Sequence, residues 1–327
     1  MGLIRDIQKN LAEDLSAMND MIASYLVARE ELVALVGKYL IDGGGKRIRP
    51  LLTILSSKMF KYSGENHIRL AAAVEFIHTA TLLHDDVVDE SAVRRFKPTA
   101  NVIWGSKSSI LVGDFLFSQS FKLMVETRSI SAMQSLSKAS AIIAEGEVAQ
   151  LVKLKERRLI TIEEYQGVIA AKTAELFAAA CEVGAIIADQ PLAHCKILWN
   201  FGMVLGNIFQ IIDDLLDYFG SEKEIGKNIA DDFLEGKVTL PLILLYDSLA
   251  PEEQAKLLTM IENDNRSWDD FLLIKKLLDQ YSIKEQVMVY LESLKIEAHS
   301  WLKQISITNR YKDYLADLVE FTVNRSF

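Results

Sequence analysis

The chain has 327 residues, of which 50% are hydrophobic, and it carries a formal net charge of −9. The apolar content excludes an intrinsically disordered chain, and the acidic balance argues against nucleic acid as the main partner. Only five prolines occur and no Pro/Gly/Ser-rich linker divides the sequence, so we expect long helices in a single domain over residues 1–327.

Helical spacing runs along the whole chain. Apolar residues between positions 4 and 25 recur every three or four residues, which predicts one helical face. A helix over 31–41 is expected to end at glycines 43–45, and Pro50 is expected to open the next helix. Residues 75–90 predict helix and residues 91–105 predict a loop. Amphipathic segments without strand alternation follow, with helices predicted over 109–127, 131–155, 162–188, 192–219 and 240–249.

The sequence carries no signal for export or for a membrane span. Residues 1–15 contain early acids and no continuous apolar core, so they predict neither a signal peptide nor a transit peptide. No charge-free apolar run reaches about eighteen residues; the segment 176–188 comes nearest, but Glu182 interrupts it. Cys181 and Cys195 lie in or beside apolar helical segments. We therefore expect reduced core thiols in a cytoplasmic protein without a transmembrane segment.

Two short aspartate motifs resemble each other, "LHDDVVD" and "IDDLLD", and each follows an apolar helical run. Residues four apart share a helical face. The motifs therefore present Asp85 with Asp89 and Asp213 with Asp217, flanked by Asp86 and Asp214. Two like charges at ~4 Å repel by about 4 kcal/mol at an effective dielectric near 20. Such a cluster needs compensation by protonation or by cations.

Hard divalent cations are the natural compensation, because Mg²⁺ takes oxygen ligands and favours one or two carboxylates plus substrate phosphates. Two aspartate faces directed at one cavity would grip a phosphorylated ligand through Mg²⁺. One alternative is a pair of solvated acidic helix faces, but the repetition after apolar helices disfavours it. Another is a metal phosphohydrolase built on the doublet His84-Asp85; no second histidine motif supports it.

Two basic clusters flank the first aspartate motif. "GGGKRIRP" places Lys46 and Arg49 after a glycine loop, and "VRRFKP" places Arg94 and Arg95 past the motif. Arginine matches phosphate oxygens bidentately, and glycine lets backbone approach an anion. The neighbouring Arg47 and Lys97 are expected to be ordinary surface charges. A site with both Mg²⁺ and direct cations suggests two anions bound side by side.

The motifs in their order and spacing resemble the trans-isoprenyl (polyprenyl) diphosphate synthase family, and most of all its bacterial octaprenyl diphosphate synthase type. The resemblance covers residues 35–249 and is carried by "GGGKRIRP", "EFIHTATLLHDDVVDES", "LVGDF", "IIAEGEV", "KTAELF", "FQIIDDLLDY" and "GKNIADDFLEGKVTLPL". It implies an all-α, single-domain helical bundle around a deep central cavity, the isoprenoid synthase type, as a homodimer. Its partners would be isopentenyl diphosphate and an allylic diphosphate, with peripheral membrane contact for product release.

The resemblance assigns a role to each matching position. It implies Mg²⁺ binding by the six aspartates Asp85, Asp86, Asp89, Asp213, Asp214 and Asp217. It implies isopentenyl diphosphate contacts at Lys46, Arg49, His78 and Arg95. It implies allylic-side contacts at Arg94, Lys172, Thr173, Gln210 and Lys227. The catalytic set would be Asp85, Asp86, Asp89, Asp213, Asp214 and Lys172.

The implied chemistry needs no protein nucleophile. Mg²⁺ and cations would stabilise charge on the departing diphosphate, the double bond of isopentenyl diphosphate would attack the allylic cation, and a proton would leave. Phe96 departs from the pattern, since the family commonly has glycine there. A glycine permits positive φ that phenylalanine resists, so we expect the loop after Arg95 to have its own shape. The ending "NRSF" also lacks the usual strongly basic terminus.

Product length should depend on small side chains upstream of the first motif. Ala80 and Thr81 lie five and four residues before Asp85, where a bulky aromatic would block a growing tail. They predict a long product, which the resemblance makes an octaprenyl chain for quinones such as ubiquinone; Phe121, Met124 and Met133 are candidates for the tunnel floor. The alternatives are a shorter- or longer-chain synthase, a terpene cyclase, a non-catalytic subunit of a heteromeric synthase and a simple helical interaction protein.

Overall fold

The computed structural model describes residues 2–43, 45–220 and 229–324, and these residues are almost entirely helical. They form two compact units. Unit 1 comprises residues 1–140, 176–202 and 301–318, and unit 2 comprises residues 141–175, 203–300 and 319–327. The expected all-α fold is confirmed. The expectation of one domain around a central cavity stays a prediction.

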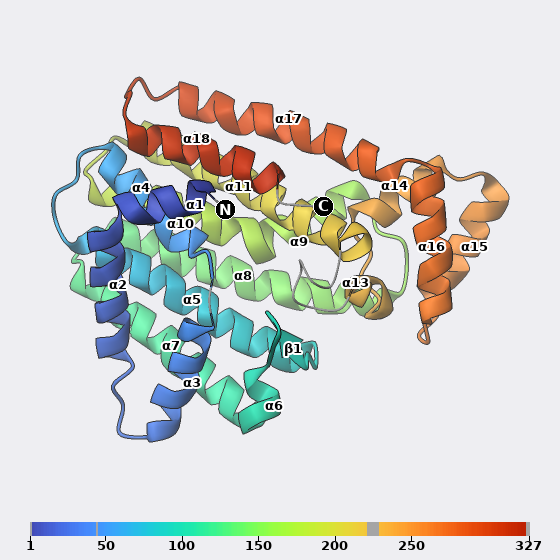
Figure 1. Cartoon of the computed structure of the whole chain (residues 1–327), viewed down its shortest axis with the longest axis horizontal. Coiled ribbons are helices and arrows are strands. Elements are labelled where there is room, and N and C mark those ends of the chain that lie inside the picture. Colours follow the sequence, from blue (N-terminus) through green and yellow to red (C-terminus); the bar gives the residue numbers. More distant parts are fainter. Residues whose placement is uncertain (1, 44, 221–228, 325–327) are drawn as a thin grey trace. The chain divides into compact units, whose positions relative to one another are not determined.

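Unit 1 contains the N-terminal helices, a short hairpin and the ends of longer helices (Figure 1). Its elements are α1 (Gly2–Asn10), α2 (Ala12–Tyr25), α3 (Glu31–Asp42), α4 (Ile48–Met59), α5 (Asn66–Val88), β1 (Val93–Arg94), β2 (Lys97–Pro98), α6 (Ala100–Trp104) and α7 (Ser106–Glu126), with parts of α8 (Ile130–Glu156), α10 (Glu175–Ile187), α11 (Leu192–Phe219) and α18 (Arg310–Val323).

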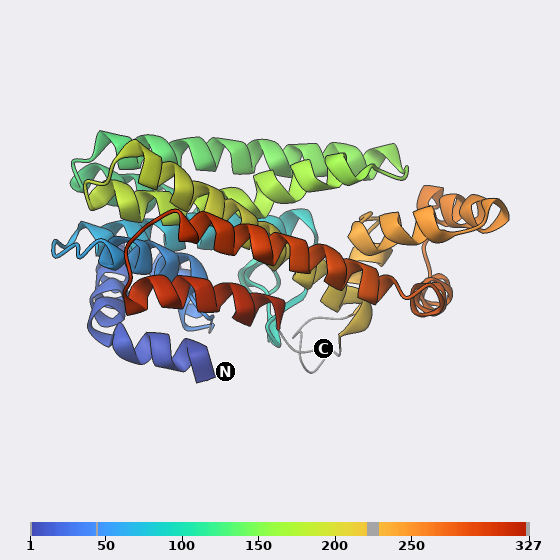
Figure 2. The same ribbon diagram turned by 90° about the horizontal axis from the view of Figure 1, so that it is seen from above.

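Unit 2 holds the remainder of α8 and α11 and the C-terminal helices (Figure 2). Its further elements are α9 (Ile162–Ile169), the π-helix η1 (Ala170–Ala174), α13 (Asp231–Leu234), α14 (Leu240–Ser248), α15 (Pro251–Glu262), α16 (Trp268–Gln280) and all but the last three residues of α17 (Ile283–Lys303). Within this unit α16 packs against α13 and α14, and α9 packs against α14.

Helix α5 is the centre of unit 1. It packs along α7 and also contacts α2 and α4, and its residues Ala71, Ala72 and Ala73 are completely buried. Small side chains let neighbouring helices approach closely while the larger ones fill the space between them. The hydroxyl of Ser109 on α7 donates to the carbonyl of Leu83 on α5 at 3.1 Å. This packing fixes the helix that ends in the first aspartate motif.

Three predicted elements need correction. The expected loop 91–105 contains the β1–β2 hairpin and α6, because Arg95 and Phe96 take the left-handed turn conformation. The expected helix 162–188 is interrupted by the π-helix η1. Helix α4 begins at Ile48, two residues before Pro50, which still lies in its first turn.

The buried thiols and the most apolar helix also bear on the sequence predictions. Cys181 and Cys195 are buried free cysteines, as expected. Among the described helices, α11 rather than the segment 176–188 is long and apolar enough to cross a membrane. More than half of its most apolar stretch is buried within the protein. This is weak support for a span, because core helices of soluble proteins have the same composition.

Candidate active site

The first aspartate motif forms the C-terminal end of α5. Asp85 and Asp86 lie in its last turn, and Asp89 follows at the cap, where its backbone N–H donates to the Asp85 carbonyl at 2.8 Å. Asp85 and Asp89 are partly exposed, whereas Asp86 is buried. The expected arrangement, two aspartates on one face with Asp86 beside them, is therefore present.

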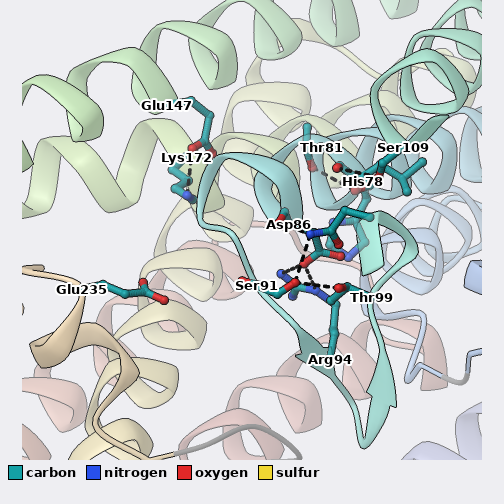
Figure 3. Close-up of polar contacts among 12 residues, drawn as sticks. His78, Thr81, Asp86, Ser91, Arg94, Thr99, Ser109, Glu147, Lys172 and Glu235 are labelled. Carbon is teal, nitrogen blue, oxygen red and sulfur yellow. Dashed lines mark hydrogen bonds and ion pairs between the residues drawn. The ribbon is translucent and has the colours of Figure 1, made fainter. Parts of the chain in front are cut away.

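Asp86 is held by Arg94 of the hairpin (Figure 3). The Nε and Nη2 atoms of Arg94 both donate to Oδ1 of Asp86 at 2.8 Å. Oδ2 of Asp86 is buried and accepts no hydrogen bond from any residue that the structure describes. Burial raises the pKa of Asp86, and the Arg94 guanidinium opposes that shift. One oxygen is thus neutralised by the protein, while the other is oriented but unsatisfied.

The hairpin turn consists of Arg95 and Phe96, whose φ angles are +52° and +63°. Both φ angles are positive, as in the tight two-residue turns that join antiparallel strands. Phe96 therefore adopts the conformation for which glycine is better suited, and the residue is 67% exposed. The expectation that phenylalanine would give the loop a different shape is not supported at this residue. Instead, the turn retains a left-handed conformation that is costly for a bulky side chain.

The basic residues of unit 1 meet around His78. Arg49 Nη1 lies 3.2 Å from Nε2 of His78, and its guanidinium stacks 4.5 Å from the ring centre of Phe177. Burial, together with the nearby Arg49 and Arg95, holds the pKa of His78 well below its usual value. A neutral imidazole offers one donor and one acceptor to a ligand.

The glycine loop approaches the hairpin through the side chain of Arg95. A Cβ at Gly45 would lie 2.9 Å from Nη1 of Arg95, so a larger residue at this position would require the Arg95 side chain to shift. Arg47 pairs with Glu75 at 2.9 Å, and Lys46 is exposed. Burial and the adjacent Arg94 lower the pKa of the Arg95 guanidinium, and the carboxylate of Glu75 opposes that shift.

Some of these residues line a pocket of unit 1 with about 550 Å³ of space up to and including its mouth, whereas Lys46, Arg49, Asp85 and Asp89 are not part of its lining. Small-molecule sites typically span a few hundred cubic ångströms or more. Its lining includes four predicted site residues, His78, Asp86, Arg94 and Arg95, together with Glu75, Thr79, Leu82 and Lys97. The pocket therefore combines several cations with one buried carboxylate, a composition suited to a phosphorylated ligand.

The second aspartate motif lies near the end of α11 in unit 2. Asp213 is partly exposed, whereas Asp214 and Asp217 are buried. Oδ2 of Asp217 accepts the backbone N–H of Asp232 at 3.1 Å, in the first turn of α13. Such a bond satisfies a helix-start amide. Asp217 thereby connects α11 to α13.

Asp214 lies in a continuous hydrogen-bond chain. Tyr165 donates its hydroxyl to Oδ2 of Asp214 at 2.6 Å, and Gln210 donates its amide nitrogen to Oδ1 at 2.7 Å. Thr173 donates to the Gln210 carbonyl oxygen at 2.7 Å. Burial raises the pKa of Asp214, and the carboxylate of Asp232 raises it further. This chain of hydrogen bonds joins Thr173 and Gln210, two predicted substrate contacts, to Asp214, a predicted metal ligand.

Lys172 and Thr173 lie within the π-helix η1, a feature that often occurs at functional sites. Lys172 Nζ pairs with Glu147 of α8 at 2.8 Å (Figure 3). A Cβ at Gly146 would lie 2.8 Å from the Ala171 Cβ and 3.1 Å from the Lys172 backbone nitrogen. Gly146 therefore permits the close approach at which Glu147 reaches Lys172.

Unit 2 has its own pocket, with about 770 Å³ of space up to and including its mouth. Four predicted site residues line it: Lys172, Thr173, Gln210 and Asp214. Further lining residues include Lys153, Tyr165, Asp232 and Lys237. Lys227, also predicted to contact the allylic substrate, lies outside the described residues. The pocket therefore mixes carboxylates, lysines and uncharged donors.

The donor chemistry fits a hard divalent cation bound with help from a substrate. Within the described residues, no three His, Cys, Asp or Glu side chains are gathered closely enough to hold a metal ion by themselves. Magnesium usually takes only one or two protein carboxylates and completes its shell with phosphates and water. The buried, unsatisfied Oδ2 of Asp86 suits that incomplete arrangement.

The sequence analysis missed Tyr165, Glu147 and Asp232 as site residues. A single tyrosine in an amphipathic helix carries no distinguishing signal, and the contacts of Glu147 and Asp232 arise only from folding. Conversely, Ala80 and Thr81 do not line the unit 1 pocket. Ala80 is 1% exposed, and Thr81 donates to the His78 carbonyl at 2.8 Å. Their role in product length stays a prediction.

His84, which raised the phosphohydrolase alternative, is turned toward α7. Its Nε2 lies 3.2 Å from the carbonyl of Ile110 and 3.4 Å from Oδ1 of Asp114. These contacts place the imidazole between two helices beside the aspartate motif. They give the imidazole two polar partners on α7.

The all-α fold, the aspartate motifs near the ends of α5 and α11, and the cationic pockets are accompanied by similarity to one family of enzymes. The polyprenyl synthetase family model matches residues 30–278. The octaprenyl diphosphate synthase of Escherichia coli (strain K12) is 43% identical over 262 residues, which are 80% of this chain and 81% of that one.

Solved structures agree with this match. A polyprenyl synthase from Caulobacter crescentus, complexed with calcium and isoprenyl diphosphate, has a TM-score of 0.94 at 39% identity and covers 99% of this chain and 98% of its own. A decaprenyl diphosphate synthase from Rhodobacter capsulatus has a TM-score of 0.92 at 41% identity, covering 98% and 99%. The chain belongs to the polyprenyl synthetase family. It is a prenyltransferase with the isoprenoid synthase fold, of the trans-polyprenyl diphosphate synthase type.

Proposed function

We propose that the protein makes all-trans octaprenyl diphosphate, a precursor of quinone side chains, by adding isopentenyl diphosphate units to an allylic diphosphate such as farnesyl diphosphate. The observation that carries the proposal is the pair of pockets. A pocket of unit 1 includes Asp86 and a pocket of unit 2 includes Asp214, each beside cationic side chains. Similarity to the octaprenyl diphosphate synthase of E. coli supports the product size.

In unit 1, the proposed isopentenyl diphosphate contacts are Lys46, Arg49, His78 and Arg95. Arg49 stacks on the ring of Phe177 and Arg95 lies beside Gly45, and both guanidinium groups can pair with diphosphate oxygens. His78 stays neutral and can donate or accept a hydrogen bond. A preorganised cationic pocket binds the diphosphate without reorganising during the reaction.

On the allylic side, the proposed contacts are Arg94, Lys172, Thr173, Gln210 and Lys227. Glu147 orients the Lys172 ammonium, and the π-helix presents Lys172 and Thr173 as adjacent residues. Cations at this position stabilise the negative charge that grows on the departing diphosphate. The released diphosphate accepts the proton lost after carbon–carbon bond formation, so the reaction needs no dedicated protein base.

Magnesium is the proposed cofactor, and Asp85, Asp86, Asp89, Asp213, Asp214 and Asp217 are the residues that would hold it. When bound, Mg²⁺ would neutralise the diphosphate and make it a better leaving group. The all-oxygen donor set supports this choice. Calcium in the Caulobacter crescentus relative supports a hard divalent cation. Arg94 and the Tyr165–Gln210 pair orient two of the aspartates in the described structure.

A homodimer is the proposed assembly. Several apolar side chains of α7 are exposed in this single chain: Ile110, Leu111, Phe121 and Val125. Clustered exposed apolar residues on one helix support burial against another surface. Phe121 is therefore better suited to an interface than to the tunnel floor that the sequence suggested, while Met124 is buried. A cytoplasmic location, with peripheral membrane contact during product release, completes the proposal.

The experiment that tests the activity measures diphosphate release from purified protein. We expect release only when isopentenyl diphosphate, farnesyl diphosphate and Mg²⁺ are all present, and loss of release on adding a chelator. A terpene cyclase would release diphosphate from the allylic substrate alone. A non-catalytic subunit would release none. Either result would overturn the proposed function.

A further inference from the structure

Tyr165 is a buried residue that the proposed reaction does not use directly. It lies on α9, whose start is fixed by a capping box between Thr161 and Glu164. Its side chain is 3% exposed. A phenylalanine ring would bury the same apolar surface without a polar atom that needs a partner. The hydroxyl is therefore informative, because its partner is Oδ2 of Asp214 at 2.6 Å.

The carboxylate of Asp214 is fixed from both sides. Oδ2 accepts from Tyr165 and Oδ1 accepts from the amide of Gln210. The amide orientation of Gln210 is determined by its two bonds, since its oxygen accepts the Thr173 hydroxyl while its nitrogen donates to Asp214. A rotation of the carboxylate would break at least one of these bonds.

The same chain reaches a predicted substrate contact. The hydroxyl hydrogen of Thr173 is donated to Gln210. An ionised diphosphate oxygen can only accept, so Thr173 must redirect that hydrogen in order to donate to a ligand. The amide oxygen of Gln210 would then lose its hydrogen-bond donor, and this would affect the hydrogen bond that the amide nitrogen donates to Asp214. The two ends of the chain, Thr173 and Tyr165, are thus linked through one amide and one carboxylate.

We propose that Tyr165 is a positioning residue that fixes the Asp214 carboxylate and, through Gln210, couples its orientation to the Thr173 hydroxyl, so that the allylic diphosphate meets a carboxylate whose orientation is already set. This inference rests on the proposed function. It concerns the allylic side alone, because the four residues belong to unit 2 and line its pocket. Supporting hydrogen bonds of this kind orient the groups that touch metal or substrate.

The test compares Tyr165→Phe with Tyr281→Phe. The control removes an equivalent hydroxyl, which donates to the carboxylate of Glu253 at 2.7 Å elsewhere in unit 2. We expect Tyr165→Phe to lower kcat/KM for farnesyl diphosphate by about 10- to 100-fold. The KM for isopentenyl diphosphate should stay unchanged. Tyr281→Phe should match the wild type in both.

Binding gives a readout that does not depend on turnover. Calorimetric titration with inorganic diphosphate in the presence of Mg²⁺ should show about tenfold weaker binding for Tyr165→Phe and unchanged binding for Tyr281→Phe. Thermal unfolding of both variants checks that they fold. A residue with a merely structural role would lower the unfolding temperature without separating the two substrates.

A double variant tests whether the chain acts as a unit. If Tyr165 and Gln210 both work through Asp214, the effects of Tyr165→Phe and Gln210→Leu on kcat/KM for farnesyl diphosphate should combine to less than their product. Fully multiplicative effects would overturn the inference, as would a Tyr165→Phe variant that behaves like Tyr281→Phe. The condensation activity of the wild type is measured separately. If the wild type condenses the two substrates and Tyr165→Phe is unimpaired, this inference fails and the proposed function stands.

Discussion

Replacing Arg94 by leucine removes the only described side chain that donates to the Asp86 carboxylate. The Asp86 side chain is 1% exposed, so its charge would be left in a dry site. Breaking a buried ion pair from one side costs about 3–5 kcal/mol. The Arg94 side chain is 36% exposed, however, and solvent screening reduces the value. We expect Arg94→Leu to lower the free energy of unfolding by about 2 kcal/mol.

The companion change Asp86→Asn distinguishes this mechanism from general damage. An uncharged amide does not need the guanidinium, so the double variant should be more stable than Arg94→Leu alone, with a coupling of about 1–2 kcal/mol. The matched control is Arg69→Leu. Arg69 lies on α5, the same helix as Asp86, but pairs at 3.5 Å with Glu65, whose side chain is 84% exposed. Its loss should cost less than about 0.5 kcal/mol.

The assay is urea unfolding of the wild type, the three single variants and the double variant, followed by circular dichroism. The reasoning about a buried pair would be refuted if Arg94→Leu cost no more than Arg69→Leu. It would also be refuted if Asp86→Asn failed to recover stability in the Arg94→Leu background. Unchanged m-values would show that the differences arise from stability rather than from a changed unfolded state.

Three further predictions address the turn, the histidine and the product length. Phe96→Gly should raise the free energy of unfolding by up to about 1 kcal/mol, because relief of a left-handed bulky residue outweighs the entropy of glycine; a lower unfolding temperature would contradict it. The depressed pKa of His78 keeps the imidazole neutral in the folded protein. Below pH ~6.5 the unfolded chain therefore binds a proton at His78 that the folded chain does not bind. As the pH is lowered further, the free energy of unfolding falls by up to about 1.4 kcal/mol per pH unit. His78→Gln should reduce this loss between pH 6.5 and 5.5, and parallel pH curves would exclude it. Ala80→Tyr should shorten the product, as judged by mass, in protein that still unfolds cooperatively; an unchanged product distribution would remove Ala80 from the tunnel.

Much of the fold could be predicted because helical spacing is continuous. The helix over 192–219 is observed with the same limits, and those over 31–41, 109–127, 131–155 and 240–249 differ by a few residues. The hairpin could not be predicted, since its two-residue strands are too short to show alternation and its turn lacks glycine. The π-helix could not be predicted either, because its five residues are too few to show a period of their own.

The candidate site was predictable where several charged residues cluster in the sequence. Asp86 and Arg94 stood out for that reason, and the structure brings them to one pocket together with His78, a single histidine in an apolar helix. Supporting residues were not predictable in the same way. Tyr165 is 49 residues from Asp214 and Glu147 is 25 residues from Lys172. Nothing in the local sequence of either residue indicates its partner, so only the folded arrangement reveals these contacts.

The length of the product tests the central claim most directly. Purified protein is supplied with farnesyl diphosphate, excess isopentenyl diphosphate and Mg²⁺, and the dephosphorylated products are measured by mass spectrometry. The account predicts an all-trans product of forty carbons, formed by repeated addition of the five-carbon unit. An end product of fifteen or twenty carbons would contradict the long-chain assignment, and no elongation at all would contradict the proposed activity itself.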